Sequence, residues 1–168
     1  MVDRKLAVLR AMSTITRSTD MDEFMRMAGL TLTDVLDTLK ELAHEGFVTK
    51  TGKGYTIAEK GKVALIALSL LPDDKAFHFY LGLGQPAGFS ARSVKEFYDA
   101  VQNVPSSSLE FHLERQDFEN WFKTTVQDAV FTRQLAGLRQ TVLKDEALRT
   151  QILLGLEARY GEDILNRE

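Results

Sequence analysis

The chain has 168 residues, of which 44% are hydrophobic and 27% are charged, and its formal net charge is -3. This composition excludes a disordered chain, and the lack of cysteine excludes a disulfide framework and thiolate metal sites. The longest apolar stretch, residues 63–71, is about half as long as a membrane span, and residues 1–12 lack the apolar core of a signal peptide, so we expect a cytoplasmic protein without a membrane partner.

The charged residues are divided unevenly along the chain. Residues 1–62 contain 10 Lys and Arg against 9 Asp and Glu, whereas residues 63–168 contain 11 against 15. Neither half is therefore a basic module. Any affinity for nucleic acid has to come from a local cluster of cations, because Lys and Arg supply nearly all non-specific binding.

The beginning of the chain predicts two helices. Apolar residues recur at helical spacing after Asp3, which is a favourable N-cap residue, and residues 16–19 break this pattern. Asp20 and Glu23 then have the spacing of a capping box. Gly29 supplies the left-handed conformation that ends a short second helix.

A third helix and a hairpin follow. Thr31 and Asp34 again have capping-box spacing, and Gly46 ends the helix that begins there. Residues 47–51 and 55–59 alternate in the manner of strands, and a lysine flanked by glycines separates them. The order of these predicted elements is that of a winged helix-turn-helix.

Two sequence segments, LTDVLDTLKELAHEGFV and GYTIAEKGKVAL, resemble the sequence pattern that is usual in prokaryotic, archaeal-type winged-helix transcription regulators. The resemblance covers residues 3–71. It implies that the third helix lies in a major groove of DNA and that the hairpin, the wing, lies beside a minor groove or the backbone. We therefore expect a winged-helix domain over residues 1–71 that binds double-stranded DNA.

The third helix carries acidic residues that are unexpected in a helix that approaches DNA. The apolar residues assigned to its inward face are Leu32, Val35, Leu36, Leu39, Leu42 and Ala43. The residues that this assignment places on the outward face are Thr33, Asp34, Asp37, Thr38, Lys40, Glu41 and His44. Phosphates would repel the carboxylates, although Asp34 can serve the N-terminus of its own helix and Asp37 can accept from cytosine. His44 is interpreted as a helix-end histidine.

The expected contacts with DNA come from this helix and from cations around it. The candidate DNA-binding residues are Arg17, Thr33, Asp37, Thr38, Lys50, Lys53, Lys60 and Lys62. The alternative is a non-enzymatic adaptor, in which the winged helix contacts a protein partner through its acidic third helix and has no role in DNA binding.

Residues 63–71 contain a single polar residue, so a helix here is apolar on nearly every side and has to be covered all round. We expect the second half of the chain, a second copy in a homodimer, or both to cover it. The residues assigned to this dimerisation or interdomain contact are Val63, Ile66, Leu68, Leu70 and Leu71. A twofold dimer would also suit a palindromic DNA site.

Residues 72–75 form the predicted linker to an α-rich accessory domain over residues 76–168. Residues 76–82 predict one short strand, which has to pair with a symmetry mate, with the wing, or with nothing. Helices are then predicted to start at Ser90, Ser107, Asp117, Asp128 and Asp145.

Residues 82–87 formally match a glycine-rich loop that binds the phosphates of a nucleotide. Pro86 interrupts the match where a helix should offer its free N–H groups, and no second strand follows. We therefore interpret the segment as a turn. The glycines expected to take unusual backbone angles are Gly82, Gly84 and Gly88.

Residues 108–121 are the segment of the second half with the most distinctive composition, because they combine aromatic residues with a histidine and several carboxylates. His112, Glu114 and Asp117 suggest a metal site, but His112 and Glu114 are two residues apart and point to different faces of a helix. We therefore predict no metal and no cofactor. Aromatic residues here either line a ligand pocket or form a core. The candidate pocket residues are Phe111, His112, Phe118, Trp121 and Phe122.

The second half also resembles a bacterial and archaeal domain family of unknown function, over residues 76–139. This resemblance rests on an aromatic strand, a glycine turn and a helix from Ser90 to Phe97, followed by a set of single residues. These residues are Ser108, Leu109, Phe111, His112, Arg115, Asp117, Phe118, Trp121, Asp128, Leu135 and Ala136. The resemblance implies a defined domain and no particular chemistry.

Together these patterns predict a mainly α fold with a small β-hairpin, in which a winged helix precedes an α-helical domain with one short strand. The predicted function is that of a DNA-binding transcription regulator whose second domain dimerises or senses a ligand. No catalytic residue is predicted, because no Ser/His/Asp, Cys/His or metal constellation converges, so we expect no enzyme.

Overall fold

The computed structural model describes residues 3–14, 21–52 and 54–167. The chain divides into two compact units, of which the first comprises the described residues up to Leu65 together with Arg167, and the second comprises residues 66–166. The division falls inside a helix, α4 (Glu59–Leu68), and the segment 72–75 belongs to the second unit. Among the described residues, every helix is too short or too polar to span a bilayer.

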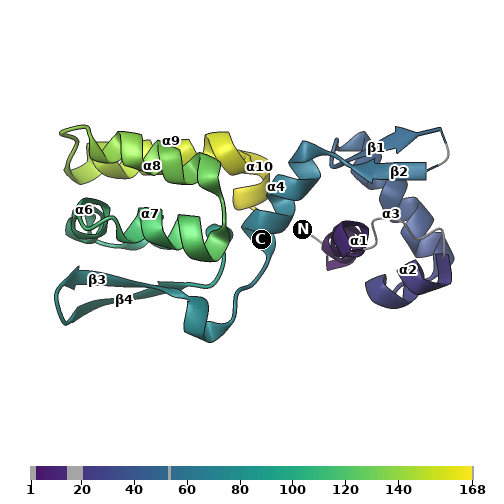
Figure 1. The fold of residues 1–168 in the computed structure, drawn as a ribbon, viewed down its shortest axis with the longest axis horizontal. Coiled ribbons are helices and arrows are strands. Elements are labelled where there is room, and N and C mark those ends of the chain that lie inside the picture. Colours follow the sequence, from purple (N-terminus) through teal and green to yellow (C-terminus); the bar gives the residue numbers. More distant parts are fainter. Residues whose placement is uncertain (1–2, 15–20, 53, 168) are drawn as a thin grey trace. The chain divides into compact units, whose positions relative to one another are not determined.

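The first unit is a group of helices followed by an antiparallel hairpin (Figure 1). Its elements before α4 are α1 (Asp3–Thr14), α2 (Met21–Ala28), α3 (Leu32–His44), β1 (Val48–Thr51) and β2 (Gly54–Ile57). The hairpin places Val48 opposite Ile57 and Thr51 opposite Gly54. Its core is apolar, because the side chains of Leu9, Val35, Leu42 and Phe47 are fully buried.

The signals at the end of α2 and at both ends of α3 act as the sequence predicts. Thr31 is the N-cap of α3, and its hydroxyl accepts a hydrogen bond from the backbone N–H of Asp34. Gly29 and Gly46 follow α2 and α3 with φ angles of +65° and +84°, a conformation that glycine adopts without strain. Asp20, which the sequence predicts as the cap of α2, lies outside the described residues.

The inward face of α3 differs from the predicted one. Leu32 and Leu36, predicted to point inward, are 45% and 41% exposed, whereas Thr38, predicted to point outward, is fully buried. The prediction was wrong for these three positions because the buried stripe is centred on Val35, Thr38, Leu39 and Leu42. Burial of Thr38 is possible because its hydroxyl donates to the carbonyl oxygen of Asp34, at 2.6 Å.

Helix α4 begins against the backbone that precedes the hairpin. A Cβ atom at position 61 would overlap the carbonyl oxygen of Phe47, so Gly61 permits a close approach that any other residue would prevent. The helix ends at Leu68, which leaves the last residues of the apolar run 63–71 outside it.

The second unit begins with a hairpin and continues with helices. Its elements after α4 are η1 (Asp73–Lys75), β3 (Phe77–Gly82), β4 (Gln85–Ala91), α5 (Val94–Asn103), α6 (Ser106–Glu114), α7 (Asp117–Trp121), η2 (Phe122–Val126), α8 (Ala129–Arg139), α9 (Asp145–Tyr160) and α10 (Glu162–Leu165). Figure 1 shows α6 and α7 as a middle layer between the hairpin and the layer formed by α8 and α9. An aromatic cluster fills the space between the hairpin and the helices, where Phe97 and Trp121 stack with ring centroids 5.5 Å apart.

The strand β3 has a partner that the sequence did not indicate. It pairs with β4 as an antiparallel hairpin, with Phe77 opposite Ala91 and Gly82 opposite Gln85. The prediction of one short strand in this unit is therefore wrong. Ser90 lies in β4 and caps no helix, whereas the hydroxyl of Ser93 accepts a hydrogen bond from the N–H of Glu96 at the start of α5, at 3.0 Å.

The glycine-rich segment 82–87 forms the turn of this hairpin and the start of β4. Gly84 and Gly88 have φ angles of +70° and +83°, as expected for the turn interpretation, whereas Gly82 does not take a positive φ. Pro86 is accommodated within β4, opposite Tyr80.

The later helices start close to their predicted positions. Asp128 caps α8, and one of its carboxylate oxygens accepts hydrogen bonds from the N–H groups of Val130 and Phe131 at 3.1 and 3.2 Å. Asp117 and Asp145 are the first residues of α7 and α9 and are not their N-caps. The segment after α7, η2, is a π-helical turn that no sequence signal predicted.

Candidate functional site

Two of the three acidic residues of α3, Asp34 and Glu41, lie against cations of α1. The Arg4 guanidinium lies 3.1 Å from a carboxylate oxygen of Glu41 and 3.9 Å from one of Asp34. The ammonium group of Lys5 lies 3.5 Å from Glu41 and 2.5 Å from Glu45. The hydrogen bond from Lys5 lowers the pKa of Glu45, against the opposing effect of burial.

The carboxylate of Asp34 also serves the N-terminus of its own helix. It accepts a hydrogen bond from the hydroxyl of Thr31 at 2.8 Å, which closes a reciprocal cap with the bond that Thr31 accepts from the Asp34 N–H. Two of the acids predicted to face outward, Asp34 and Glu41, are therefore engaged at the α1 side of the helix. Asp37 and Lys40 are exposed on the remaining outward face.

The predicted DNA-binding residues are not all available on one surface. Thr33, Asp37, Lys50 and Lys62 are exposed, whereas Thr38 is buried and cannot contact a base. Lys60 donates to the carbonyl oxygen of Glu45 at 3.1 Å and lies 4.5 Å from the centroid of the Phe47 ring. Two further candidates, Arg17 and Lys53, lie outside the described residues.

The residues predicted to mediate dimerisation differ in exposure. Val63 is 7% exposed and Leu70 is 59% exposed, while Ile66, Leu68 and Leu71 are intermediate. Val63 is therefore already covered within the chain, and Leu70 offers the largest exposed apolar surface of this set.

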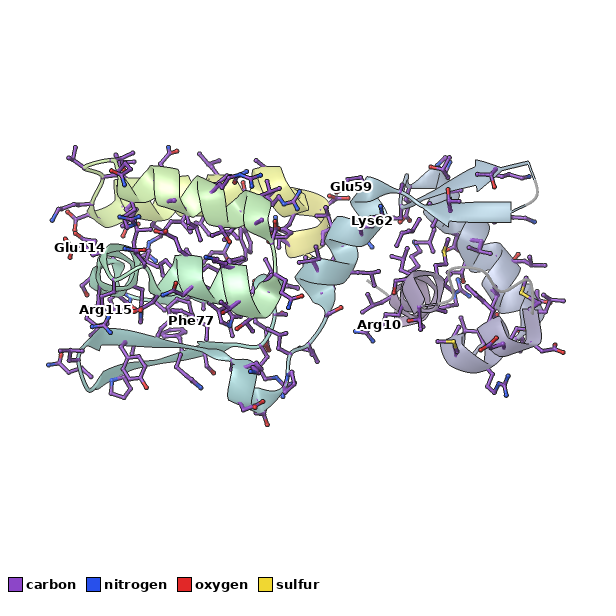
Figure 2. All side chains as sticks on the ribbon, in the orientation of Figure 1. Arg10, Glu59, Lys62, Phe77, Glu114 and Arg115 are labelled. Atoms are coloured by element: carbon purple, nitrogen blue, oxygen red, sulfur yellow. The ribbon has the colours of Figure 1, made fainter. Side chains whose placement is uncertain are left out.

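The second unit contains a cavity of about 660 Å³ beside the hairpin. It is lined by residues of β3 and its turn, of α6, of α7 and of η2, namely Phe77, His78, Tyr80, Gly82, Leu83, Gly84, Phe111, His112, Arg115, Asp117, Asn120, Trp121, Thr124 and Thr125. Figure 2 shows Phe77 and Arg115 in the layer between the hairpin and the helices α6 and α7. A cavity of this volume is within the range of small-molecule sites.

His112 connects the strand to the helices at the floor of this cavity. It is 3% exposed, its Nε2 accepts a hydrogen bond from the backbone N–H of Tyr80 at 2.8 Å, and its Nδ1 lies 2.8 Å from Oδ2 of Asp117. Since Nε2 is the acceptor, the proton is on Nδ1 and the ring is neutral. Burial lowers the pKa of His112 and outweighs the hydrogen bond to Asp117.

Arg115 and Asp117 form the polar edge of the cavity. The Nε–H group of Arg115 donates to Oδ2 of Asp117 at 3.2 Å, the same oxygen that faces His112, and the guanidinium lies 5.0 Å from the centroid of the Phe111 ring. The indole N–H of Trp121 donates to the carbonyl oxygen of Lys75 at 2.9 Å, which fixes the ring at the cavity wall.

The sequence identified part of this cavity. Phe111, His112 and Trp121 line it, whereas Phe118 and Phe122 are fully buried in the aromatic core and do not. The polar residues of the lining that sequence reasoning missed are His78, Tyr80, Arg115, Asn120, Thr124 and Thr125. His78 and Tyr80 come from β3, whereas the other four come from the segment that runs from the end of α6 through η2, so the two groups are distant in the sequence and no local pattern brings them together.

Within the described residues, no three His, Asp or Glu side chains gather as they would around a metal ion. Comparison of the chain with models of protein families, with curated proteins and with solved structures finds no match. The geometry of each unit is therefore the basis for the function proposed below.

Proposed function

We propose that the protein is a cytoplasmic, winged-helix DNA-binding transcription regulator, related to the archaeal-type regulators that residues 3–71 resemble. In this proposal α3 is the helix that enters a major groove and the hairpin of β1 and β2 is the wing. The second unit dimerises or senses a ligand, and no catalytic step is involved.

The observation that carries the proposal is the pairing of α3 carboxylates with cations of α1. Arg4 and Lys5 lie within ion-pair distance of Glu41, and Arg4 also approaches Asp34. Opposite charges at these distances offset one another, so the negative potential expected from the sequence is reduced on the face of α3. This pairing supports the proposal for Asp34 and Glu41, whereas Asp37 remains an exposed carboxylate on the same face.

Further support comes from the side chains left on that face and on the hairpin. Thr33, Lys40 and His44 are exposed along α3, and Lys50 is exposed on β1. Lysine ammonium groups can neutralise phosphates, and a threonine can contact a base or a thymine methyl group.

The proposal is tested with a Lys40→Glu, Lys50→Glu double variant in fluorescence-anisotropy binding to random duplex DNA. We expect weaker binding to every duplex and a salt dependence that is shallower by about two phosphate contacts. The matched control is Arg133→Glu, which reverses an exposed charge on α8 of the second unit. Unchanged affinity of the double variant would remove these lysines from the interface.

A second candidate function is the protein adaptor, which uses the same face without DNA. The observation that favours it is the exposure of Leu32 and Leu36 on α3, at 45% and 41%. Exposed leucines beside Asp37 suit a protein partner better than a phosphate backbone. Two results together would favour this function over DNA binding. The wild-type protein would bind no duplex at low salt, and the Leu36→Ser variant would no longer capture a protein partner that the wild type captures.

Homodimerisation through the end of the apolar run is part of the first proposal. Leu70 is the residue to test, because it is 59% exposed and its replacement should not disturb the core. We expect Leu70→Asp to be monomeric by light scattering if this surface forms the dimer. A dimeric Leu70→Asp protein would place the contact elsewhere.

A further inference from the structure

The cavity of the second unit combines an aromatic wall with polar groups that still have bonding capacity. Its apolar surface includes the rings of Phe77, Phe111 and Trp121. Rings in such a wall favour a flat ligand that can stack or pack edge to face against them. The volume of about 660 Å³ accommodates a molecule of one or two rings.

The polar edge of the cavity offers both donors and acceptors. The side chain of Arg115 makes one hydrogen bond, from its Nε–H to Oδ2 of Asp117. The side chain of Asp117 makes one more, with His112, through the same oxygen. Within the residues that the structure describes, these two side chains have no other hydrogen bonds. Both Nη groups of Arg115 and Oδ1 of Asp117 therefore remain free to bind a ligand. The side-chain amide of Asn120, also in the lining, is likewise without a partner within the described chain.

The charges of this edge balance. Arg115 carries a positive charge, Asp117 a negative one, and the buried His112 is neutral. An anionic ligand at Arg115 would be repelled by Asp117, which is within hydrogen-bond distance of Arg115, and a cationic ligand at Asp117 would be repelled by Arg115. A neutral ligand gains charge-assisted hydrogen bonds from both groups without either repulsion.

We propose that this cavity binds a neutral, planar heterocycle that carries a ring N–H beside a ring carbonyl, the lactam edge found in nucleobases. The N–H donates to Oδ1 of Asp117, the carbonyl oxygen accepts from an Nη group of Arg115, and the ring lies against Trp121 and its neighbours. The inference rests on the ligand-sensing branch of the proposed function and names its ligand class.

Trp121 gives a direct readout, because it is the single tryptophan of the chain and lines the cavity. The full-length protein is titrated with uracil and with hypoxanthine, which carry the lactam edge, and with benzoate and benzamidine, which are a flat anion and a flat cation. Calorimetry measures binding, and the emission of Trp121 reports its location. We expect the two lactams to bind with a change in emission, and the two charged rings to bind at least about tenfold more weakly.

The matched variants are Arg115→Gln and Arg133→Gln. Arg115 and Arg133 are both exposed, so neither replacement should unfold the protein, which far-UV circular dichroism checks. We expect Arg115→Gln to weaken lactam binding by about tenfold or more, and Arg133→Gln to leave it unchanged. Each of three results would overturn the proposal. Neither lactam binds, benzoate or benzamidine binds more tightly than the lactams, or the lactams bind without a change in the emission of Trp121. These titrations contain no DNA, so their failure is distinguishable from a failure of DNA binding.

Discussion

One ion-pair network of the first unit and one of the second differ in how far their charged side chains are buried. In the first unit Arg4 and Glu41 pair on the surface, with 35% and 45% of the two side chains exposed. In the second unit Asp128 accepts from Arg159 and Tyr160 with 1% of its side chain exposed. An exposed pair contributes about 0–1 kcal/mol, whereas breaking a buried one costs about 3–5 kcal/mol. The exposed network therefore mainly sets the surface charge of α3, and the buried network mainly sets stability.

The largest expected effect is that of Asp128→Ala. The change removes the acceptor of two bonds from Arg159, at 2.9 and 3.0 Å, and of one from the Tyr160 hydroxyl at 2.6 Å, together with the cap of α8. We expect the free energy of unfolding of the second unit to fall by about 3–5 kcal/mol, because Asp128 is buried and its replacement breaks a buried ion pair together with the hydrogen bond from Tyr160. Urea unfolding followed by circular dichroism measures the loss.

The matched control for this prediction is Asp73→Ala in the same unit. Asp73 pairs with Arg92 at 2.6 Å, but 87% of its side chain is exposed. We expect a change below about 1 kcal/mol. Equal losses for Asp73→Ala and Asp128→Ala would contradict the distinction between exposed and buried networks.

A smaller effect is expected from acidification, through His112. Burial lowers the pKa of His112 from its ordinary value of 6.5, so below pH 6.5 the unfolded chain binds a proton that the folded chain does not. The stability that neutral His112 contributes is complete above pH 6.5 and is lost as the pH falls from there toward the lower pKa of the folded state.

The measurement is the melting temperature as a function of pH for the wild type, His112→Gln and His78→Gln. His78 is exposed at the cavity and serves as the control. We expect the pH dependence in this window to be reduced in His112→Gln and retained in His78→Gln. The assignment to His112 fails if His112→Gln keeps the slope of the wild type.

The smallest effect on stability is expected from the exposed pair of the first unit. Arg4→Glu should change the free energy of unfolding by about 1 kcal/mol or less, yet it should weaken duplex binding because it removes the cation that Glu41 and Asp34 share and adds a carboxylate beside them. The charge-swapped double variant Arg4→Glu, Glu41→Arg has the net charge of the wild type. We expect it to recover most of the affinity in the anisotropy assay. A double variant as weak as Arg4→Glu would show that the pairing does not matter for DNA.

Local signals predicted some helix ends and not others, since Ser90 lies in β4 and Asp117 and Asp145 are not N-caps. Thr31 and Asp128 cap helices through hydrogen bonds to nearby N–H groups, and Gly29 and Gly46 end helices with positive φ, so a few adjacent residues contain all the information needed. The inward stripe of α3 was only partly predictable, because Thr38 is buried through a bond to its own helix that apolar spacing does not indicate.

Features that depend on distant contacts could not be predicted. The strand β4 contains Pro86 and Gly88, which have low strand propensity, and it forms because β3 supplies a partner. Arg4 and Glu41 are 37 positions apart in the sequence, so their pairing had no local signature. In the cavity, Arg115 and Asp117 are only two positions apart, and it is their approach to His78 and Tyr80 of β3 that had no local signature. Phe111, His112 and Trp121, which were candidate pocket residues from the sequence, lie in the lining.

The most direct test of the proposed function is the salt dependence of binding of the wild-type protein to duplex DNA, by fluorescence anisotropy at about 50 and about 200 mM salt. The cations among the candidate DNA-binding residues are Arg17, Lys50, Lys53, Lys60 and Lys62. About five phosphate contacts per protomer predict a log–log slope of about -4, and a dimer doubles this value. An absence of binding at the lower salt concentration, or binding that does not weaken with salt, would contradict DNA recognition by α3 and the hairpin.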